Sequence, residues 1–245
     1  MKTIKNISKE ISIKRKNLKN RPRIWLINQF SNTPDLPGHT RQYEISKVLS
    51  NLGWSVSVFS SDFNLSKREF TKLKKFQLSK KVWIENIQWF WLRVTPYKIN
   101  NWKRYLNMIS FCFNLFINLS FELFTSLINY NKGIVLASSP QLPAAFVSFI
   151  IAKLFRHFFV LEIRDLWPQV LIDNSNGNSN KLVIKTLLLL EKILYRYSDS
   201  LVVLSKGVQN YVKRKGVKKV ICLPNGPNLQ EFKFMPLPLE KKSFS

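Results

Sequence analysis

One apolar segment that carries charge only at its end constrains the fold most. Residues 158–163, FFVLEI, form a short hydrophobic run in which Glu162 is the only charge. Such a run is typical of a strand buried on both faces, as in a parallel sheet. Arg164 and Asp165 follow where this strand should end. Pro168 disfavours helical backbone in the residue before it, so the chain should turn there.

The Arg164-Asp165 pair is placed where a ligand would meet it. In open α/β sheets, ligands bind beyond the carboxyl ends of the strands. The alternative is an ion pair between chain neighbours that only holds a loop in place. This segment by itself favours neither interpretation.

The rest of the chain alternates between strand and helix patterns. We expect further strands at 23–30, 55–60, 133–137, 200–204 and 220–223, and one or two strands within 82–94, with a turn near 85–86. We expect helices at 42–52, 101–130, 142–155, 181–197 and 206–215. Residues 62–81 are polar and lysine-rich, which indicates a loop with a short helix, and 174–180 indicate a surface loop. This order predicts an α/β fold with a doubly wound parallel sheet.

Two predicted helices have local features of their own. The helix at 42–52 carries apolar residues at 45, 48, 49 and 52, and Gly53 follows it as a terminating glycine. Ser205 is placed to cap the helix that follows it.

Charge is the outlying feature of the composition. The 245 residues contain 39 Lys and Arg against 14 Asp and Glu, a net charge of +25. Residues 1–23 hold nine basic residues and one acidic residue, which leaves +17 on the rest. A lysine-rich solvated surface is the simplest explanation, and attraction to an anionic partner is the functional one. We find no zinc-binding spacing, no RNA-binding aromatic motif and no basic zipper, so we expect an anionic membrane surface or phosphate and no nucleic acid.

The cysteines and the N-terminus indicate a cytoplasmic protein. Cys112 and Cys222 lie far apart and suggest a reducing compartment without a disulfide framework. The basic N-terminus has no apolar core behind it, so it is not a secretory signal. We expect residues 1–22 to be a disordered basic arm.

The helix at 101–130 allows two interpretations. Residues 109–128 are apolar enough to suggest a membrane span, but Ser110, Asn114, Asn118 and Glu122 recur every four residues as one polar stripe. The helix either packs on the sheet or lies at a membrane surface, and both can hold on different faces. Residues 97–105 mix aromatic and basic side chains in a way that suits lipid headgroups. We expect peripheral attachment to the inner face of the plasma membrane.

Three strand-end loops should meet along one edge of the sheet. In the first, Gly38 allows close approach of the backbone to a ligand, and His39 is a possible proton carrier. In the second, Ser139 offers a hydroxyl at a helix start. The third holds Arg164 and Asp165. For His39 and Ser139 the alternative is plain helix capping.

Five segments in this order resemble glycosyltransferases of family 4. They are PGHTRQYEISKVLSNLGWSVSVFSS, SSPQLPAAF, VLEIRDLWPQ, YRYSDSLVVLSKGV and PNGPNLQEF, within residues 23–232. The resemblance is to the N-terminal half of the two-Rossmann GT-B fold. The RDLWP stretch is most similar to the subgroup that builds surface polysaccharide, O-antigen and capsule sugars.

The resemblance implies roles for the loop residues. Gly38 and His39 would lie beside the donor diphosphate and the transferred sugar, and Arg41 would contact phosphate. Arg164 and Asp165 would form the acceptor site, where Asp165 would orient the acceptor hydroxyl or accept its proton.

Further residues would face the same cleft, and two positions depart from the family pattern. The remaining substrate-binding candidates are Ser139, Ser205, Asn225 and Gly226. A second glycine common in the family is replaced by His39. A histidine that many relatives carry after the strand at 158–163 is replaced by the Arg-Asp pair, so its role does not transfer.

The resemblance also implies a division into domains. We expect a Rossmann-like domain at 23–235 and a tail at 236–245. The family continues into a second domain that binds the nucleotide-sugar and holds paired glutamates, whereas only Glu240 is acidic after Phe232. We therefore expect this second domain to be absent, with the nucleotide-sugar donor held by a missing domain or a partner chain. No cofactor and no metal are implied.

The expected activity is that of the acceptor-binding half of a retaining glycosyltransferase, inactive without the second domain. It would help to transfer a sugar from a nucleotide-sugar to a lipid-linked sugar or polysaccharide acceptor. The alternatives are a non-catalytic membrane- or partner-binding subunit or truncated remnant, and, from charge alone, a nucleic-acid binder.

Overall fold

The computed structural model of the protein describes residues 21–98, 102–128, 132–139, 141–169, 172 and 181–226. The basic arm up to residue 20, the loop 174–180 and the tail 236–245 lie outside the described residues. The strands are β1 (Arg23–Ile27), β2 (Ser55–Ser61), β3 (Phe63–Asn64), β4 (Glu69–Phe70), β5 (Ser79–Ile84), β6 (Ile87–Leu92), β7 (Gly133–Ser138), β8 (Phe158–Ile163), β9 (Ser200–Val203) and β10 (Val220–Cys222). The helices are α2 (Arg41–Asn51), α3 (Trp102–Ile128), α4 (Leu142–Leu154), α6 (Lys181–Tyr197) and α7 (Lys206–Arg214).

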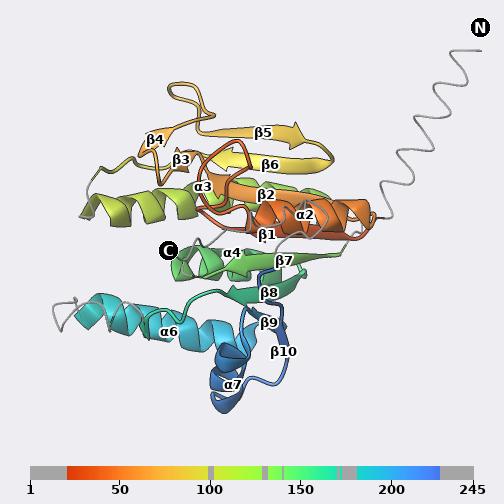
Figure 1. The fold of residues 1–245 in the computed structure, drawn as a ribbon, viewed down its shortest axis with the longest axis vertical. Coiled ribbons are helices and arrows are strands. Elements are labelled where there is room, and N and C mark those ends of the chain that lie inside the picture. Colours follow the sequence, from red (N-terminus) through yellow and green to blue (C-terminus); the bar gives the residue numbers. More distant parts are fainter. Residues whose placement is uncertain are drawn as a thin grey trace, which may run out of the picture.

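Eight strands form one sheet in the order β10-β9-β8-β7-β1-β2-β6-β5. Figure 1 shows them following one another from β5 at the top to β10 near the bottom. Every neighbouring pair is parallel except β5 and β6, which form an antiparallel hairpin. From β1 the chain moves one way to β2 and later the other way through β7 and β8. This reversal beside β1 is the switch point at which doubly wound sheets bind ligands, and it confirms the predicted fold class.

The alternation of side chains along β1 divides the core in two. Trp25 and Ile27 point to the face covered by α3, α4, α6 and α7. Ile24 and Leu26 point to the opposite face, where Tyr43 of α2 packs. A strand with both faces covered must be apolar at every position, which is why the run RIWLI is hydrophobic after its first residue.

The prediction of a short helix within 62–81 is wrong. This stretch forms the small β3–β4 hairpin and the start of β5. Asp62 is buried, and its carboxylate accepts the backbone N–H groups of Lys72 at 2.5 Å and Leu73 at 2.8 Å. Because this carboxylate satisfies backbone donors, the segment folds around it rather than into helical hydrogen bonds.

The buried face of α2 also differs from the apolar stripe expected there. Val48 and Leu52 are 59% and 71% exposed, whereas Gln42, Tyr43 and Ser46 are buried. The helix is rotated so that Gln42 faces the carboxyl edge of the sheet, where it hydrogen-bonds to buried polar groups. Ile45 and Leu49, the other two residues of the expected stripe, do pack against the core, so the expectation holds for half of the stripe.

Helix α3 turns its polar stripe inward and an apolar surface outward. The Ser110 hydroxyl accepts the Thr95 N–H at 2.8 Å, and the Asn114 amide donates to the Arg93 carbonyl at 2.8 Å. The outward side chains are large and exposed: Trp102, Tyr105, Ile109, Phe113, Phe116, Ile117, Phe121 and Phe124. By length and composition α3 is the one helix among the described residues that could cross a membrane. A buried face and an exposed apolar face coexist on it.

Candidate functional site

A buried carboxylate lies at the centre of the carboxyl edge of the sheet. Glu162, the penultimate residue of β8, is 1% exposed. Its carboxylate accepts hydrogen bonds from Arg41 Nε at 2.9 Å, from Gln42 Nε2 at 3.2 Å and from the Ser138 hydroxyl. These bonds join the start of α2 to the ends of β7 and β8. Sequence reasoning did not select Glu162, although a lone carboxylate in an apolar strand was the available signal.

The Arg41 guanidinium links this carboxylate to the end of β10. It donates to Asn225 Oδ1 at 2.6 Å and to the Leu223 carbonyl at 3.1 Å, in addition to Glu162. Two of the predicted site residues, Arg41 and Asn225, are therefore in direct contact. These bonds use three of the five N–H groups of the side chain. Contact between Arg41 and a phosphate remains a prediction. The two remaining N–H groups of the guanidinium would make it.

His39, Arg164 and Asp165 come together from two different loops. Partial burial lowers the pKa of His39, the positive charge of Arg164 lowers this pKa further, and the charge of Asp165 opposes both effects. Such influence requires that the three side chains lie near one another. The lowered pKa leaves the His39 imidazole neutral near pH 7, able to accept a proton or a hydrogen bond.

Ser139 holds the loop that follows β8. Its hydroxyl accepts the Arg164 N–H at 3.2 Å and donates to the Asp165 carbonyl at 3.3 Å. Among the residues that the structure describes, no ion pair joins the side chains of Arg164 and Asp165. The exposed Asp165 carboxylate is available to a ligand, and its backbone is fixed by Ser139.

Gly38 determines the shape of the first loop. Its φ is +134°, and a Cβ atom there would lie 2.3 Å from the amide nitrogen of Asn32. That nitrogen donates to the Pro37 carbonyl at 3.1 Å, and the Asn32 N–H donates to the His39 carbonyl at 2.8 Å. A side chain at position 38 would break this loop, so Gly38 places His39.

The last two candidates lie on neighbouring strand ends. Ser205 follows β9 and caps α7, accepting the Val208 N–H at 3.3 Å, as predicted. Gly226 is exposed beside Asn225 after β10. Ligand contacts by Ser205 and Gly226 stay predictions.

Several buried polar atoms at the end of β1 have no hydrogen-bond partner within the described part of the chain. They are Asn28 Nδ2, Gln29 Oε1, Ser31 Oγ and Gln42 Oε1. Buried polar groups are normally paired, because leaving one unpaired costs about 1–3 kcal/mol. Gln29 turns toward α3, where its amide donates to Asn107, and the other three residues follow β1 or begin α2. These atoms indicate room for ordered water or a polar ligand around the end of β1.

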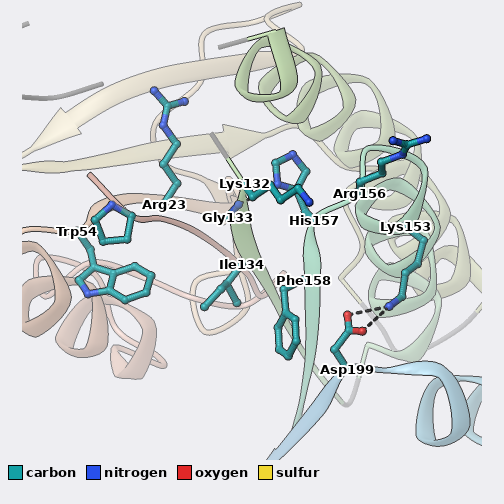
Figure 2. A pocket seen from close by; sticks show the side chains of 11 residues that line it. Arg23, Trp54, Lys132, Gly133, Ile134, Lys153, Arg156, His157, Phe158 and Asp199 are labelled. Carbon is teal, nitrogen blue, oxygen red and sulfur yellow. Dashed lines mark hydrogen bonds and ion pairs between the residues drawn. The ribbon is translucent and has the colours of Figure 1, made fainter. Parts of the chain in front are cut away.

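A basic hollow of about 490 Å³ lies at the opposite, amino edge of the sheet. In Figure 2 the guanidinium groups of Arg23 and Arg156 lie on different sides and point away from Phe158. Lys153 is paired with Asp199 at 2.7 Å. The cations do not converge, so this hollow is not a built anion site. No cluster of three metal-ligating side chains occurs among the described residues.

The comparisons with known proteins bear on the fold. No family model matches the sequence, and no curated protein matches it. Among solved structures, the chain is similar to sucrose-phosphate synthase from Thermosynechococcus elongatus, with a TM-score of 0.50 and 14% identity, over 84% of this chain and 90% of that chain. At this identity the likeness shows the fold alone. The chain has the Rossmann-like fold of the N-terminal half of a GT-B glycosyltransferase.

Proposed function

We propose that the chain is the acceptor-binding half of a retaining glycosyltransferase of the family 4 type. It would help to transfer a sugar from a nucleotide-sugar to a lipid-linked or polysaccharide acceptor in surface-polysaccharide synthesis. The observation that supports this most is the placement of two loops at the carboxyl edge. His39 lies beside Ser31, whose buried hydroxyl has no partner among the described residues, and Ser139 holds Arg164 and Asp165 at the end of β8. A neutral imidazole, a cation and an exposed carboxylate suit a site where a hydroxyl attacks and a diphosphate leaves.

Each of these side chains has a role in the proposed chemistry. Asp165 orients the acceptor hydroxyl or accepts its proton. Arg164 and the positive end of α2 stabilise the charge that develops on the leaving diphosphate. The Glu162 carboxylate does not touch substrate in this scheme; it holds the Arg41 side chain, which joins α2 to the end of β10. The two remaining N–H groups of Arg41 contact a phosphate of the donor.

The donor must be held by a second domain. The described residues form one Rossmann-like sheet, and a GT-B reaction takes place between two such domains. A continuation of the chain or a separate chain would supply the nucleotide contacts. Without them donor and acceptor are not held in reacting geometry, and positioning accounts for about 7–11 kcal/mol of a barrier.

The test replaces Asp165 in a reconstituted enzyme. A polypeptide of residues 1–245 is combined with a second-domain protein and assayed with radiolabelled nucleotide-sugars and membrane lipids. Asp165→Asn should lower the transfer rate about 10²–10⁴-fold and leave the melting temperature unchanged. The matched control is Glu69→Gln, which alters an exposed carboxylate on β4 and should change neither value.

Two results would contradict the proposal. If Asp165→Asn keeps full activity and lowers the melting temperature, the residue is structural. Turnover by residues 1–245 without any second domain would show that the chain is not half of an enzyme.

A second candidate function is a non-catalytic subunit that binds a membrane or a partner. The exposed apolar surface of α3 favours it, since such surfaces mark interaction sites. Binding to anionic vesicles without transfer in any reconstitution would support this function instead. In both cases we propose a cytoplasmic protein held peripherally at the inner face of the plasma membrane.

A further inference from the structure

An apolar cavity of about 570 Å³ opens beside the proposed acceptor site. It lies between the first turns of α3, the start of α4 and the N-terminal half of α6. Trp102, Tyr105, Trp167 and Leu187 form much of its wall. The polar side chains in its lining include Arg104, Gln141 and Thr186, and none of the lining residues that the structure describes is acidic.

The cavity is joined to the carboxyl edge by short connections. The Trp167 N–H donates to the Asp165 carbonyl at 3.0 Å, so the acceptor loop continues directly into a wall of the cavity. Gln29, at the end of β1, donates from its side chain to Asn107 of α3 at 2.6 Å. Trp167, in the cavity wall, is two residues from Asp165 along the same loop.

The rim of the cavity is continuous with the outward apolar surface of α3. Trp102, Ile109 and Leu182 line the cavity and are each more than half exposed. A hydrocarbon chain can pass from this surface into the cavity without crossing a polar barrier. Among the described lining residues Arg104 carries the one charge, so the end of the ligand beside it should be anionic.

The volume distinguishes one lipid chain from two. At about 30 Å³ for each carbon group, comparable with a liquid water molecule, the cavity holds roughly 15–20 carbons. This suits a single chain better than the two chains of a membrane phospholipid.

We propose that this cavity binds the hydrocarbon chain of a single-chain lipid phosphate, the lipid part of the acceptor, with its phosphate beside Arg104. The inference rests on the proposed function for the identity of the lipid. It places the anionic end of the lipid beside Arg104 and its attached sugar toward Asp165.

The experiment measures binding of prenyl phosphates by titration calorimetry to the full chain, without nucleotide-sugar or second domain. The series from five to twenty carbons is used below micelle-forming concentrations. Each added isoprene unit should tighten Kd at least about tenfold until roughly 15–20 carbons, after which affinity should level off. Arg104→Gln should weaken geranylgeranyl phosphate about 5–10-fold and leave geranylgeraniol unchanged.

A blocking variant and a matched control test the place of binding. Val183→Trp adds an indole from α6 into the cavity and should weaken geranylgeranyl phosphate at least tenfold. Leu189→Trp makes the same kind of change on the exposed side of α6 and should stay within about twofold. Circular dichroism and melting curves verify that both variants fold.

The proposal is overturned by any of four results. These are affinity that does not depend on chain length, equal binding by Val183→Trp, tighter binding of a two-chain phosphatidate of matched carbon number, or absence of prenyl phosphate binding. In the last case light scattering would show whether a second copy covers the cavity.

The two proposals can fail separately. If prenyl phosphates bind with the expected chain-length dependence but no reconstituted enzyme transfers sugar, the cavity proposal holds and the proposed function fails. Conversely, if a reconstituted Val183→Trp enzyme transfers sugar to the lipid-linked acceptor at the normal rate, only the cavity proposal fails.

Discussion

At the scale of single residues, Glu162 is the group on which the carboxyl edge depends. Its carboxylate is buried and paired with Arg41, whose own side chain is largely covered. Removing one partner of a buried pair leaves the other charge uncompensated. Glu162→Gln should therefore lower the free energy of unfolding by about 3 kcal/mol, measured by urea denaturation. Glu69→Gln is the control and should remain within about 0.5 kcal/mol.

A stability loss below that of the control would contradict this structural role for Glu162. The carboxylate would then be held for a ligand rather than for Arg41, and it would have to be included among the acceptor-site residues. Activity assays alone cannot separate these roles, because both the structural and the ligand-binding interpretation predict lower transfer.

The same residues show what sequence can and cannot provide at this scale. The places of His39, Arg164 and Asp165 followed from the rule that parallel strands end along one edge. Glu162 did not, because its partner Arg41 lies 121 positions away and pairing at that distance leaves no local pattern. A charge in a buried strand demands a partner, but the sequence does not say which one.

At the scale of elements, the bounds of a helix or strand were predictable wherever the spacing of apolar residues agreed with the packing. The range of α6 was predicted as 181–197, as the structure has it. Leu187, Leu194 and Tyr195 pack against the core, whereas Leu182 and Leu189 of the same helix are more than half exposed. Residues 62–81 were not predictable, and the buried face of α2 was predictable only in part. In both cases side-chain hydrogen bonds, accepted by Asp62 or donated by Gln42, add interactions that periodicity does not describe.

Helix α7 offers a test of a single cap. Ser205 accepts the Val208 N–H and is exposed, so its hydroxyl has a structural role whether or not it also binds a ligand. Ser205→Ala should lower stability by about 1 kcal/mol, while Ser205→Asp should retain the cap. Urea unfolding of the three proteins checks this. If Ser205→Ala is as stable as the parent but weakens acceptor binding, the hydroxyl serves the ligand and not the helix.

At the scale of the whole molecule, net charge and one apolar surface lead to the same expectation. The chain carries +25, and the outward side of α3 presents large apolar side chains such as Phe113 and Phe121, 62% and 67% exposed. Each basic residue near an anionic bilayer contributes about 1 kcal/mol, and salt screens this attraction. In a flotation assay the protein should therefore bind anionic vesicles at low salt and dissociate from them at high salt. It should not bind DNA.

The apolar part of this attachment can be separated from the charge. The double change Phe113→Ser and Phe121→Ser leaves net charge unaltered and should weaken vesicle binding at least about tenfold, since each buried aromatic side chain is worth roughly 1.5–3 kcal/mol. Phe76→Ser is the matched control, because Phe76 is 85% exposed outside α3. An equal loss of vesicle binding in the double variant and in Phe76→Ser would show that α3 is not part of the surface that contacts the membrane.

If only detergent extracts the protein and salt has no effect, residues 102–128 cross the bilayer. The hydrogen bonds from the Asn114 amide to the Arg93 carbonyl and from the Thr95 N–H to the Ser110 hydroxyl oppose that outcome, because a spanning helix would have to break them.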